Sequence, residues 1–416
     1  MLYTLPHTVL NAADRSPNHL AFRCMESSCS YAELAKQMNQ LANCLLELGL
    51  KKGDRVGVFL NRSIETAVSI YGIMNAGGVY VPIDPNLSVE RVRFLIKDCG
   101  IRHLVTNPAQ ARRLKKVLAE KTDLRYVIGL QKDWAIPTIA WENVFQYPTS
   151  TPKVRILAQD LAYIMYTSGS TGIPKGIMHT HYSGLSYAQL SSDLYQLHAK
   201  DIFGNHAPLF FDISTFGYFS VPLKGATTII ATDAHVKMPA SLSKLIAEER
   251  ISIWYSVPLA LIQMLQRGVL EERNWDALRW ILYGGEPFPI KHLKTLMERL
   301  PQTRFSNVYG PAEVNQCTYY HFSEIPEEDE PIPLGEVWNN SEGLILDEDD
   351  KMVAAGERGE LVIRSATRMK GYWQNPALTE RSFYLQKTEY GTSNVFYRTG
   401  DLVRLDEQGR LQFLGR

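Results

Sequence analysis

The amino-acid sequence predicts an α/β protein in which parallel β-sheets covered by helices are followed by a mainly antiparallel β subdomain. Short β-branched or aromatic runs alternate with stretches of helical length as far as about Tyr320, which indicates parallel strands joined by helices. Beyond that point the pattern changes to strand–turn–strand, which favours antiparallel pairing. A chain of 416 residues with 45% apolar content exceeds the usual size of one domain. We therefore expect two α/β subdomains over residues 1–320 and a β-rich subdomain over residues 321–416.

The first predicted element is an amphipathic helix that ends at Gly49. Its apolar residues recur at spacings of four and three, as one face of a helix requires: Leu34, Met38, Leu41, Leu45 and Leu48. Seven predicted strands then follow along the chain, separated by stretches of helical length: Asp54–Leu60, Ile101–Thr106, Arg125–Leu130, Leu161–Tyr166, Ala226–Ala231, Ile253–Val257 and Trp280–Tyr283.

The predicted β-rich subdomain contains three short strands and two turns. Gly343–Leu346 leads into the acidic turn Asp347–Asp350, and Lys351–Val353 follows. A glycine-containing turn then precedes Glu360–Ile363. Closely spaced strands of this kind pair with their sequence neighbours, so we expect an antiparallel sheet.

Composition and charge exclude several classes of protein. Lys and Arg together number 44, as do Asp and Glu, so no net charge draws the chain to nucleic acid or to an anionic membrane. The five cysteines are scattered and none has C-x-x-C spacing, which argues against a disulfide framework or a zinc site. The N-terminal segment lacks the basic region and long apolar core of a signal peptide. We expect a cytoplasmic protein with neither a nucleic-acid nor a membrane partner.

The segment Tyr166–Gly176 is a candidate phosphate-binding loop. It follows an apolar strand and places three glycines, a run of Ser and Thr residues and one lysine within eleven positions. Glycine permits positive φ and close approach, so such a loop can turn backbone N–H groups and hydroxyls toward phosphate oxygens. The spacing differs from that of a G-x-x-x-x-G-K-[ST] loop. A Gly/Ser surface turn is the alternative interpretation of a bare cluster of this kind.

This loop and six further motifs resemble the adenylate-forming superfamily of acyl-CoA synthetases, firefly luciferase and nonribosomal peptide synthetase adenylation domains. The resemblance is strongest to the enzymes that activate amino acids. The motifs occur in the family order along the chain: Ser30–Leu34, Asn75–Pro85, Phe211–Thr215, Tyr309–Glu313, Gly359–Leu361 with Lys370–Trp373, and Tyr397–Asp401. The resemblance implies the large N-terminal core of the adenylate-forming α/β fold, with two helix-covered, mostly parallel sheets and a smaller antiparallel β-barrel-like subdomain.

The family activity implied by this resemblance is attack of a carboxylate on the α-phosphate of ATP. Pyrophosphate leaves and an acyl adenylate remains, a reaction that depends on positioning and charge stabilisation. The resemblance assigns Thr167, Lys175 and Glu313 to catalysis, and Glu313 as the Mg²⁺ ligand. A solvated loop glutamate is the alternative for Glu313. The residues implied to hold the β- and γ-phosphates are Thr167, Ser168, Gly169, Ser170, Thr171, Gly172 and Lys175.

The resemblance also assigns residues to the nucleoside. Asp401 would accept hydrogen bonds from both ribose hydroxyls, because a carboxylate has two acceptor oxygens. Tyr309 would stack on adenine, and Arg416, fifteen positions after Asp401, would approach the ribose and phosphate. A turn-initiating aspartate is the alternative for Asp401. The other implied nucleotide contacts are Gly284, Gly285, Glu286, Asn307 and Phe413.

One residue departs from the family pattern. The motif usually reads Y-G-P-T-E, and here Ala312 stands where the threonine is expected. The family threonine donates a hydrogen bond to a phosphate oxygen, and losing a bond to a charged group costs about 1.5–3 kcal/mol. We expect either a substitute donor or slower adenylation, and a nucleotide-binding scaffold without turnover is the alternative that this departure leaves open.

Asp212 indicates what is activated. In family members that activate amino acids, the aspartate of F-D-x-S pairs with the substrate's α-ammonium, since a buried charge needs a partner. Capping of the following helix is the alternative role for Asp212. Motif alignment gives the remaining substrate positions as Ile213, Phe216, Ser256, Leu282, Gly284, Val308, Gln316 and Cys317. With no second acid or base among them, the accepted side chain is expected to be uncharged and small to medium in size.

Proline is the favoured substrate because Val314–Tyr320 resembles the free-standing prolyl-carrier-protein ligases. Gln316 is polar at a position that we expect to be apolar in a prolyl site, so other amino acids stay open. The implied partner is a carrier protein whose phosphopantetheine thiol receives the aminoacyl group. D-alanyl-carrier-protein ligases and acyl- or aryl-CoA ligases are the alternatives.

The family follows this core with a smaller mobile domain of roughly 100 residues. The sequence stops at Gly415–Arg416, where the resemblance places the hinge. The lysine that the mobile domain contributes and the surface for thioester transfer are therefore absent from this sequence. We expect these residues alone to bind ATP and amino acid and to catalyse adenylation weakly.

Overall fold

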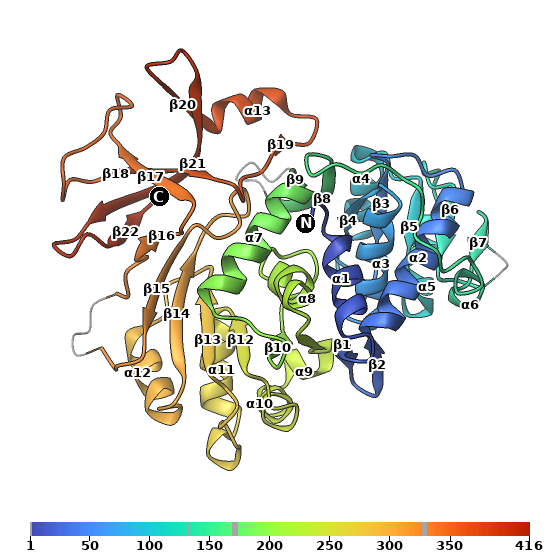
Figure 1. Cartoon of the computed structure of the whole chain (residues 1–416), viewed down its shortest axis with the longest axis horizontal. Helices are drawn as coiled ribbons and strands as arrows, with labels where there is room; N and C mark the ends of the chain where they lie inside the picture. The colour runs from blue at the N-terminus through green and yellow to red at the C-terminus, as the bar shows by residue number, and fades with distance from the viewer. Residues whose placement is uncertain (1, 132–133, 169–173, 327–330) are drawn as a thin grey trace.

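The computed structural model describes residues 2–131, 134–168, 174–326 and 331–416. Three β-sheets with flanking helices make up the structure (Figure 1). Two sheets are mostly parallel and helix-covered, and the third is antiparallel. The fold class predicted from the sequence is therefore confirmed.

Within the described residues the first sheet has nine strands, and its central six are parallel. The spatial order is β16-β15-β14-β13-β12-β10-β11-β1-β2, with antiparallel strands at both edges. The strands are β1 Leu20–Cys24, β2 Ser27–Ser30, β10 Ile202–Asn205, β11 Thr227–Ile230, β12 Ile253–Ser256, β13 Trp280–Gly284, β14 Arg304–Tyr309, β15 Thr318–Phe322 and β16 Glu336–Val337. Strands β15 and β16 extend this sheet past residue 320.

In the part of the chain that the structure describes, the second sheet has eight strands in the order β19-β9-β8-β4-β3-β5-β6-β7. The strands from β8 to β7 along this order are parallel, whereas β9 and β19 add antiparallel strands at one edge. The strands are β3 Arg55–Val58, β4 Val79–Pro82, β5 His103–Val105, β6 Tyr126–Ile128, β7 Thr138–Ile139, β8 Leu161–Ser168, β9 Pro174–Thr180 and β19 Gly371–Tyr372.

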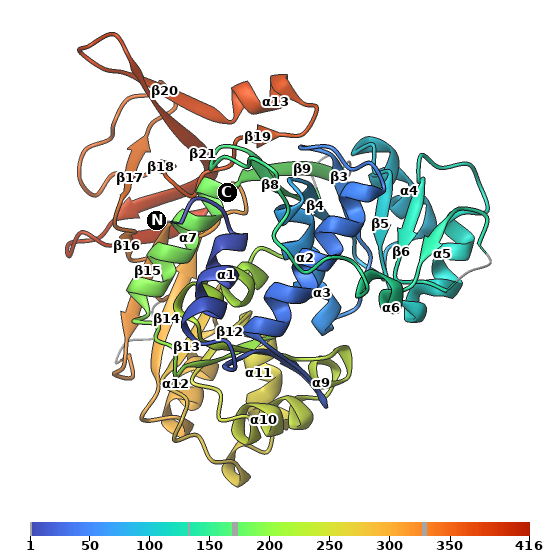
Figure 2. The ribbon, with the colours of Figure 1, turned by 45° about the vertical axis from the view of Figure 1, so that its right-hand side comes forward.

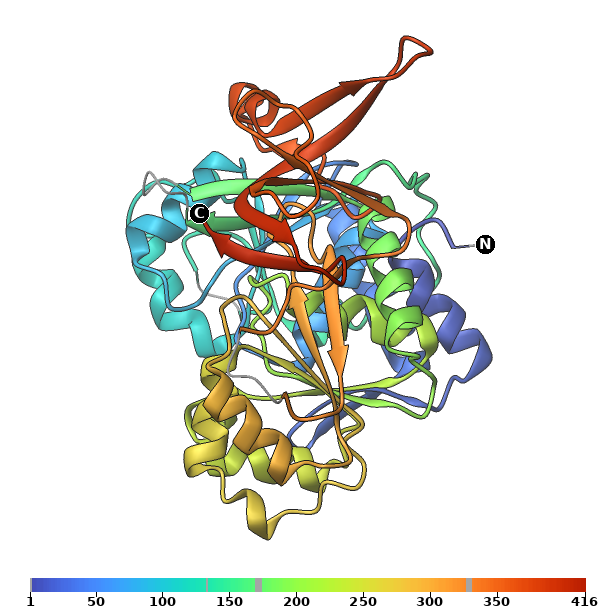
Figure 3. The same ribbon diagram turned by 90° about the vertical axis from the view of Figure 1, so that its left-hand side faces the viewer.

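The third sheet is antiparallel and lies over the ends of the orange strands of the first sheet (Figure 3). It contains β17 Ser341–Leu346, β18 Gly359–Ser365, β20 Phe383–Lys387, β21 Ser393–Leu405 and β22 Leu411–Gly415. The prediction of a strand at Lys351–Val353 is wrong. In the described residues a single bridge joins Met352 to Leu346, because the chain turns again at Ala354–Glu357.

Sixteen helical segments are present in the described residues. They are α1 Pro6–Arg15, α2 Tyr31–Glu47, α3 Ile64–Asn75, α4 Val89–Asp98, η1 Pro108–Gln110, α5 Ala111–Val117, α6 Trp141–Val144, α7 His181–Leu194, η2 Phe216–Ser220, α8 Val221–Lys224, α9 Asp233–Lys237, α10 Pro239–Glu248, α11 Pro258–Arg267, η3 Leu270–Glu272, α12 Ile290–Arg299 and α13 Pro376–Arg381. No helix in the described part of the chain is long and apolar enough to cross a membrane.

The sequence determines the start, the end and the buried face of helix α2. Ser30 and Glu33 form a reciprocal capping box at its start, which satisfies two exposed backbone donors. Gly49 follows the helix end with φ of 83°, a conformation that glycine adopts without steric cost. The apolar face predicted from the sequence is confirmed, because its first four leucine and methionine positions are fully buried.

The parallel strands place the functional motifs at one edge of each sheet. Parallel strands all end at the same edge, and ligands of open α/β sheets bind there. The segment with Asp212 follows β10, Gly284 closes β13, and Tyr309 closes β14. The candidate phosphate loop follows β8, which is parallel to β4 in the second sheet. The two edges therefore present these motifs together beneath the third sheet.

Candidate functional site

The candidate phosphate loop connects two antiparallel strands, β8 and β9. Thr167 lies opposite Lys175 across the pair, so both predicted catalytic residues sit at the strand ends that flank the loop. The phosphate contacts predicted at Gly169, Ser170, Thr171 and Gly172 and at the side chain of Ser168 lie outside the described residues. The Lys175 Nζ atom lies 5.7 Å from the ring centroid of Tyr372, a cation–π contact.

Strand β19 brings the candidate metal ligand to this hairpin. It pairs with β9, with Tyr372 opposite Ile177, and lies beside β9 in Figures 1 and 2. The hydroxyl of Tyr372 donates a 2.7 Å hydrogen bond to Oε1 of half-buried Glu313. One tyrosine therefore contacts both Lys175 and Glu313, which places the loop lysine and the candidate Mg²⁺ ligand on either side of it.

Three successive carbonyls fix the backbone around Glu313. His179 Nε2–H donates to the Ala312 carbonyl at 2.9 Å, and the Met369 amide donates to the Glu313 carbonyl at 2.6 Å. The Thr367 hydroxyl donates to the Val314 carbonyl at 2.6 Å. Each bond comes from a different residue on β9 or on the segment that precedes β19, so the segment around Glu313 is held from two sides.

The donor chemistry at Glu313 fits a hard divalent cation that also binds phosphate. The described residues contain no group of three or more His, Cys, Asp or Glu side chains able to hold a metal ion by themselves. Mg²⁺ is commonly bound by one or two carboxylates together with substrate phosphates and waters, and it does not require a complete protein cage. A single oxygen ligand beside a lysine-bearing loop matches that requirement.

The candidate ribose ligand Asp401 is almost fully buried between two donors. The Tyr309 hydroxyl lies 2.5 Å from its Oδ2 atom, and Arg416 Nε lies 2.7 Å from its Oδ1 atom. Each carboxylate oxygen can accept more than one hydrogen bond, so both retain capacity for a hydroxyl. Burial and the nearby carboxylate of Asp401 raise the pKa of Tyr309, which keeps its hydroxyl protonated as a donor.

The other predicted nucleotide contacts lie at the carboxyl ends of β13 and β14 or on β22. At Gly284, a Cβ atom would lie 2.2 Å from the Val308 carbonyl oxygen, so only glycine fits. Gly285 has φ of 92°, and the exposed Glu286 accepts a hydrogen bond from the Leu259 amide. The Asn307 side chain donates to the Pro333 carbonyl at 2.7 Å. Phe413 lies on β22 in the third sheet and is 43% exposed.

Asp212 is a half-buried carboxyl without a cationic partner among the described residues. Burial, with a contribution from Glu313, raises its pKa from 3.8 to about 6. Its Oδ1 atom accepts a 2.9 Å hydrogen bond from the Ile213 amide. The Thr215 amide bonds the Asp212 backbone carbonyl and not its side chain, so the helix-cap interpretation lacks its hydrogen bond. A desolvated carboxylate of this kind favours a bound cation.

The structure gathers most of the predicted substrate residues on one face of the first sheet. Ile213, Phe216, Leu282 and Val308 contact one another in a single hydrophobic cluster, which we call the substrate cluster. Gln316 joins it through a 2.6 Å hydrogen bond from its Nε2 atom to the Tyr255 hydroxyl. The cluster also contains the side chains of Tyr187, Tyr195, Leu197, Phe203, Val221, Ala226, Ile253, Tyr255, Trp280 and Trp338.

Two predicted substrate residues lie apart from the substrate cluster. Side chains alternate between the faces of a strand, so Ser256 and Tyr255 point to opposite faces of β12. The Ser256 hydroxyl lies 3.3 Å from Nδ1 of His206, whose ring packs against Trp254. Cys317 is fully buried in the neighbouring cluster beneath the third sheet.

Comparison with known proteins identifies the family. The family model described as AMP-binding enzyme matches residues 9–373. The chain belongs to this AMP-binding family. The resemblance to adenylate-forming enzymes is therefore confirmed.

Two curated relatives of this AMP-binding enzyme are L-proline:L-prolyl-carrier-protein ligases. The Pseudomonas fluorescens ligase is 32% identical over 413 residues, which cover 99% of this chain and 79% of the relative. The Streptomyces coelicolor ligase is 31% identical, over 99% of this chain and 78% of the relative. Bacitracin synthase 1 of Bacillus licheniformis is 32% identical over 97% of this chain, which spans 7% of that protein.

Solved structures agree with the fold. The nonribosomal peptide synthetase FmoA3 superposes with a TM-score of 0.86 at 25% identity, covering 99% of this chain and 42% of FmoA3. The N-terminal subdomain of Klebsiella oxytoca NpsA superposes with a TM-score of 0.81 at 22% identity, over 100% of both chains. At this identity, the comparison with NpsA supports the fold and not the function.

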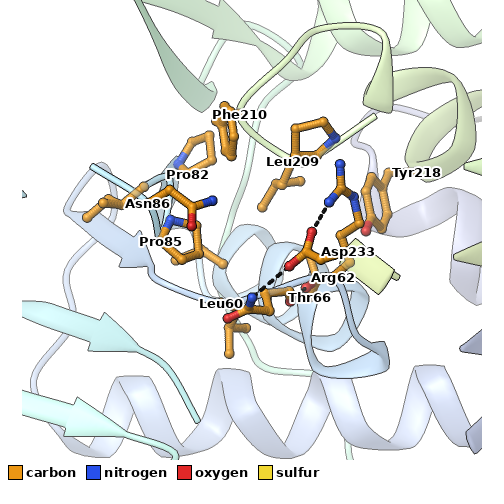
Figure 4. Close-up of a pocket in the computed structure, with 14 residues that line it drawn as sticks. Leu60, Arg62, Thr66, Pro82, Pro85, Asn86, Leu209, Phe210, Tyr218 and Asp233 are labelled. Carbon is orange, nitrogen blue, oxygen red and sulfur yellow. Dashed lines mark hydrogen bonds and ion pairs between the residues drawn. The ribbon is translucent and has the colours of Figure 1, made fainter. Parts of the chain in front are cut away.

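A pocket not anticipated from the sequence lies at the seam between the two parallel sheets (Figure 4). It is lined by residues that follow β3 and β4 of the second sheet and β10 and β11 of the first. Arg62 forms an ion pair with Asp233, and Asn61 Nδ2 donates to the same carboxylate at 2.8 Å. Leu209 and Phe210, which precede Asp212, form another wall. These polar contacts join the loops of the two sheets.

Proposed function

We propose that this chain activates a small to medium uncharged amino acid, with proline favoured, as an aminoacyl adenylate. ATP is the co-substrate, pyrophosphate is released, and the aminoacyl group passes to the phosphopantetheine thiol of a carrier protein. The observation that carries the proposal is Asp212, whose desolvated carboxyl has no cationic partner among the described residues. An α-ammonium group supplies that partner. The two prolyl-carrier-protein ligases among the relatives support the choice of proline.

The arrangement of carboxylates defines the orientation of the amino acid. Asp212 anchors the ammonium end, which directs the substrate carboxylate toward the α-phosphate of ATP. Glu313 contributes to the raised pKa of Asp212, which supports the proposal that both carboxyls belong to one site. Holding both reactants in one geometry contributes much of the rate of such a transfer.

The phosphates and the cation are assigned to Lys175 and Glu313. When bound, Mg²⁺ would neutralise charge on the phosphate oxygens. Glu313 would hold it from the segment clamped by His179, Met369 and Thr367. Lys175 is kept beside Glu313 by the Tyr372 ring and would stabilise the pyrophosphate as it leaves.

The nucleoside is assigned to the edge formed by β13, β14 and β21. Asp401 would accept the ribose hydroxyls with its remaining lone pairs, beside Tyr309 and Arg416. Gly284 permits close approach, since any larger residue there would collide with the Val308 carbonyl. The adenine ring would lie against Tyr309.

An acyl- or aryl-CoA ligase is the second candidate function. It shares the adenylation step, but its substrates carry no ammonium and would leave Asp212 desolvated without a counterion. A D-alanyl-carrier-protein ligase keeps the ammonium and differs only in the amino acid.

Thermal stabilisation by non-hydrolysable adenylate analogues tests the proposal. A prolyl analogue is compared with a cyclopentanecarbonyl analogue, which has the same ring size and lacks the amine. Binding to the folded state adds RT ln(1 + [L]/Kd), about 2.7 kcal/mol at one hundred times Kd. We expect the prolyl or another aminoacyl analogue to raise Tm well above its amine-free partner. Equal or greater stabilisation by the amine-free analogue would contradict amino-acid activation and favour the CoA-ligase function.

A further inference from the structure

Gln316 has a buried side-chain amide in which the nitrogen is hydrogen-bonded and the oxygen has no partner among the described residues. Only 4% of the residue is exposed, and its Nε2 atom donates to the Tyr255 hydroxyl at 2.6 Å. Its Oε1 atom is buried and has no partner among the described residues. Buried polar atoms are nearly always hydrogen-bonded, because an unmet acceptor loses its water without replacement. This carbonyl oxygen therefore lacks a donor that the described residues could supply.

A second unmet group lies next to Gln316 in the fold. The Trp338 amide donates to the Cys317 carbonyl at 2.9 Å, so Trp338 is joined to the residue that follows Gln316. The indole Nε1–H of Trp338, a residue that is only 2% exposed, also lacks a partner in the described structure. Its ring stacks on Tyr187 with centroids 6.0 Å apart. One acceptor, Gln316 Oε1, and one donor, Trp338 Nε1–H, therefore lack hydrogen-bond partners in the described residues at the substrate cluster.

These groups belong to the amino-acid site. Trp338, Tyr187 and Tyr255 are members of the substrate cluster, and Tyr255 bonds Gln316. Ile213, the residue after Asp212, packs against the same cluster, so the proposed ammonium anchor lies next to it in the chain. A substrate held at Asp212 by its ammonium would project its side chain toward these groups.

We propose that the side-chain end of this site selects an amino acid that carries a hydroxyl, and that Gln316 is the residue that selects it. This inference rests on the proposed function, amino-acid activation, and names the substrate class within it. In the ring series it means a hydroxylated proline in preference to proline itself.

The composition of the substrate cluster explains why a hydroxyl fits and other groups do not. A hydroxyl can donate to the Gln316 oxygen and can also accept from an N–H such as that of Trp338. A charged side chain would be left without a counterion among the cluster's apolar and aromatic residues. A wholly apolar side chain, that of proline included, would leave the Gln316 oxygen without a donor in the complex, so it should be used less efficiently than its hydroxylated counterpart.

The test uses amino-acid pairs that differ by a hydroxyl in amino-acid-dependent exchange of pyrophosphate into ATP. The pairs are 4-hydroxyproline with proline, threonine with valine, and serine with alanine. In the pair with the fastest exchange, we expect the protein to favour the hydroxylated member by at least about tenfold in kcat/KM. Replacing Gln316→Met keeps the length of the side chain and removes its hydrogen bonds. It should reduce that ratio at least about tenfold, because the hydroxyl loses its acceptor.

Two further variants keep the result interpretable. Gln302→Met changes an exposed glutamine in the same way and should leave the ratio unchanged. Tyr255→Phe removes only the hydroxyl that orients the Gln316 amide, so it should lower the ratio even if Gln316→Met fails to fold.

The outcomes separate this inference from the proposed function. Preference for the apolar member in the fastest pair, unchanged in Gln316→Met and Tyr255→Phe, overturns the selection of a hydroxyl and leaves amino-acid activation standing. Absence of exchange with all six amino acids, together with exchange supported by a carboxylic acid that lacks the amine, overturns both.

Discussion

Asp212 is the residue whose environment most restricts the substrate. Its carboxyl lies among Tyr163, Tyr187 and Tyr255, each of whose pKa it helps to raise, and its pKa is itself raised to about 6. Removing a charge from water costs free energy unless a partner offsets it. The free protein therefore carries that cost, and the ammonium that we propose for this site would offset it.

Replacing Asp212→Asn should remove aminoacyl binding and spare nucleotide binding. Truncating one member of a buried charge pair costs about 2–5 kcal/mol, so we expect at least about thirtyfold weaker binding of an aminoacyl adenylate analogue. ATP affinity should change less than about threefold, as should the affinity for an analogue without the amine. Isothermal titration calorimetry measures all three. Asp193→Asn, at an exposed position, serves as the control. An equal loss of affinity for all three ligands in Asp212→Asn would show that Asp212 has a structural role.

Amino-acid binding should depend on pH with a midpoint near the pKa of Asp212. The folded-state pKa is raised, so the carboxylate that binds the ammonium forms only as pH rises through about 6. Below that value, KM for the amino acid should rise about tenfold for each pH unit. KM for ATP measured in parallel corrects for effects common to both substrates. A constant amino-acid KM between about pH 5 and pH 7 would contradict the role given to this carboxyl.

Some residues of the site could be found from the sequence and others could not. Asp212, Glu313 and Asp401 lie in contiguous sequence motifs, so residue type and spacing are enough to propose their roles. Tyr187 comes from α7 and Trp338 follows β16, so only the folding of distant segments onto one sheet face brings them to the substrate cluster. The opposite orientation of Ser256 likewise depends on strand pleating, which motif alignment does not reveal.

At the scale of single elements, the segment that carries Glu313 depends on contacts from outside it. Asn315 has φ of 61°, an uncommon conformation for a residue other than glycine. His179 on β9 supports the segment from below, with its ring stacked on Tyr163 at 4.8 Å. Burial lowers the pKa of His179 to about 4, so the ring is neutral at pH 7 and donates through Nε2–H.

Replacing His179→Leu should disturb the nucleotide site selectively. It leaves the Ala312 carbonyl without its donor, which costs about 1–3 kcal/mol of stability. We expect KM for Mg·ATP to rise by about tenfold, because the Glu313 backbone loses one of its fixed points. His179→Gln retains an N–H donor and should recover most of the affinity. Steady-state kinetics with varied ATP measure the effect, and equal KM for both variants and the parent would contradict the support role.

Strands were predicted correctly where the residue pattern of the segment itself favours a strand. The seven predicted strands match β3, β5, β6, β8, β11, β12 and β13 within a few residues, since each is a buried β-branched or aromatic run. The pattern of glycines and hydroxyl residues predicted a loop that includes Lys175 and Gly176, whereas both lie in β9. That strand includes Pro174 and a lysine, and it forms because β8 and β19 pair with it on either side.

At the scale of the whole molecule, the site depends on a short tie between the third sheet and the second. Lys370 and Trp373 donate backbone hydrogen bonds to Met178 and Gly176 on β9. The Trp373 indole donates to the Asp98 carbonyl at 2.9 Å, and the Arg55 guanidinium lies 5.0 Å from its ring. Since Tyr372 lies within this tie, holding the sheets together also places Tyr372 against Glu313 and Lys175.

Replacing Trp373→Ala should loosen this tie. Loss of a large, partly buried aromatic side chain costs about 2–4 kcal/mol, and the Asp98 carbonyl loses its donor. We expect lower stability in urea unfolding followed by tryptophan fluorescence and circular dichroism. Trp373→Phe keeps ring packing and should lose less than half as much. A stability equal to that of the parent in Trp373→Ala would show that the tie contributes little.

Amino-acid-dependent exchange of labelled pyrophosphate into ATP tests the central claim most directly. The assay compares proline with cyclopentanecarboxylate, which matches its ring size and lacks the amine, and extends to a panel of uncharged amino acids. We predict exchange with proline or another uncharged amino acid, no exchange with the amine-free acid, and loss of exchange in Asp212→Asn. Exchange supported by cyclopentanecarboxylate and other amine-free acids, and by no amino acid, would contradict amino-acid activation.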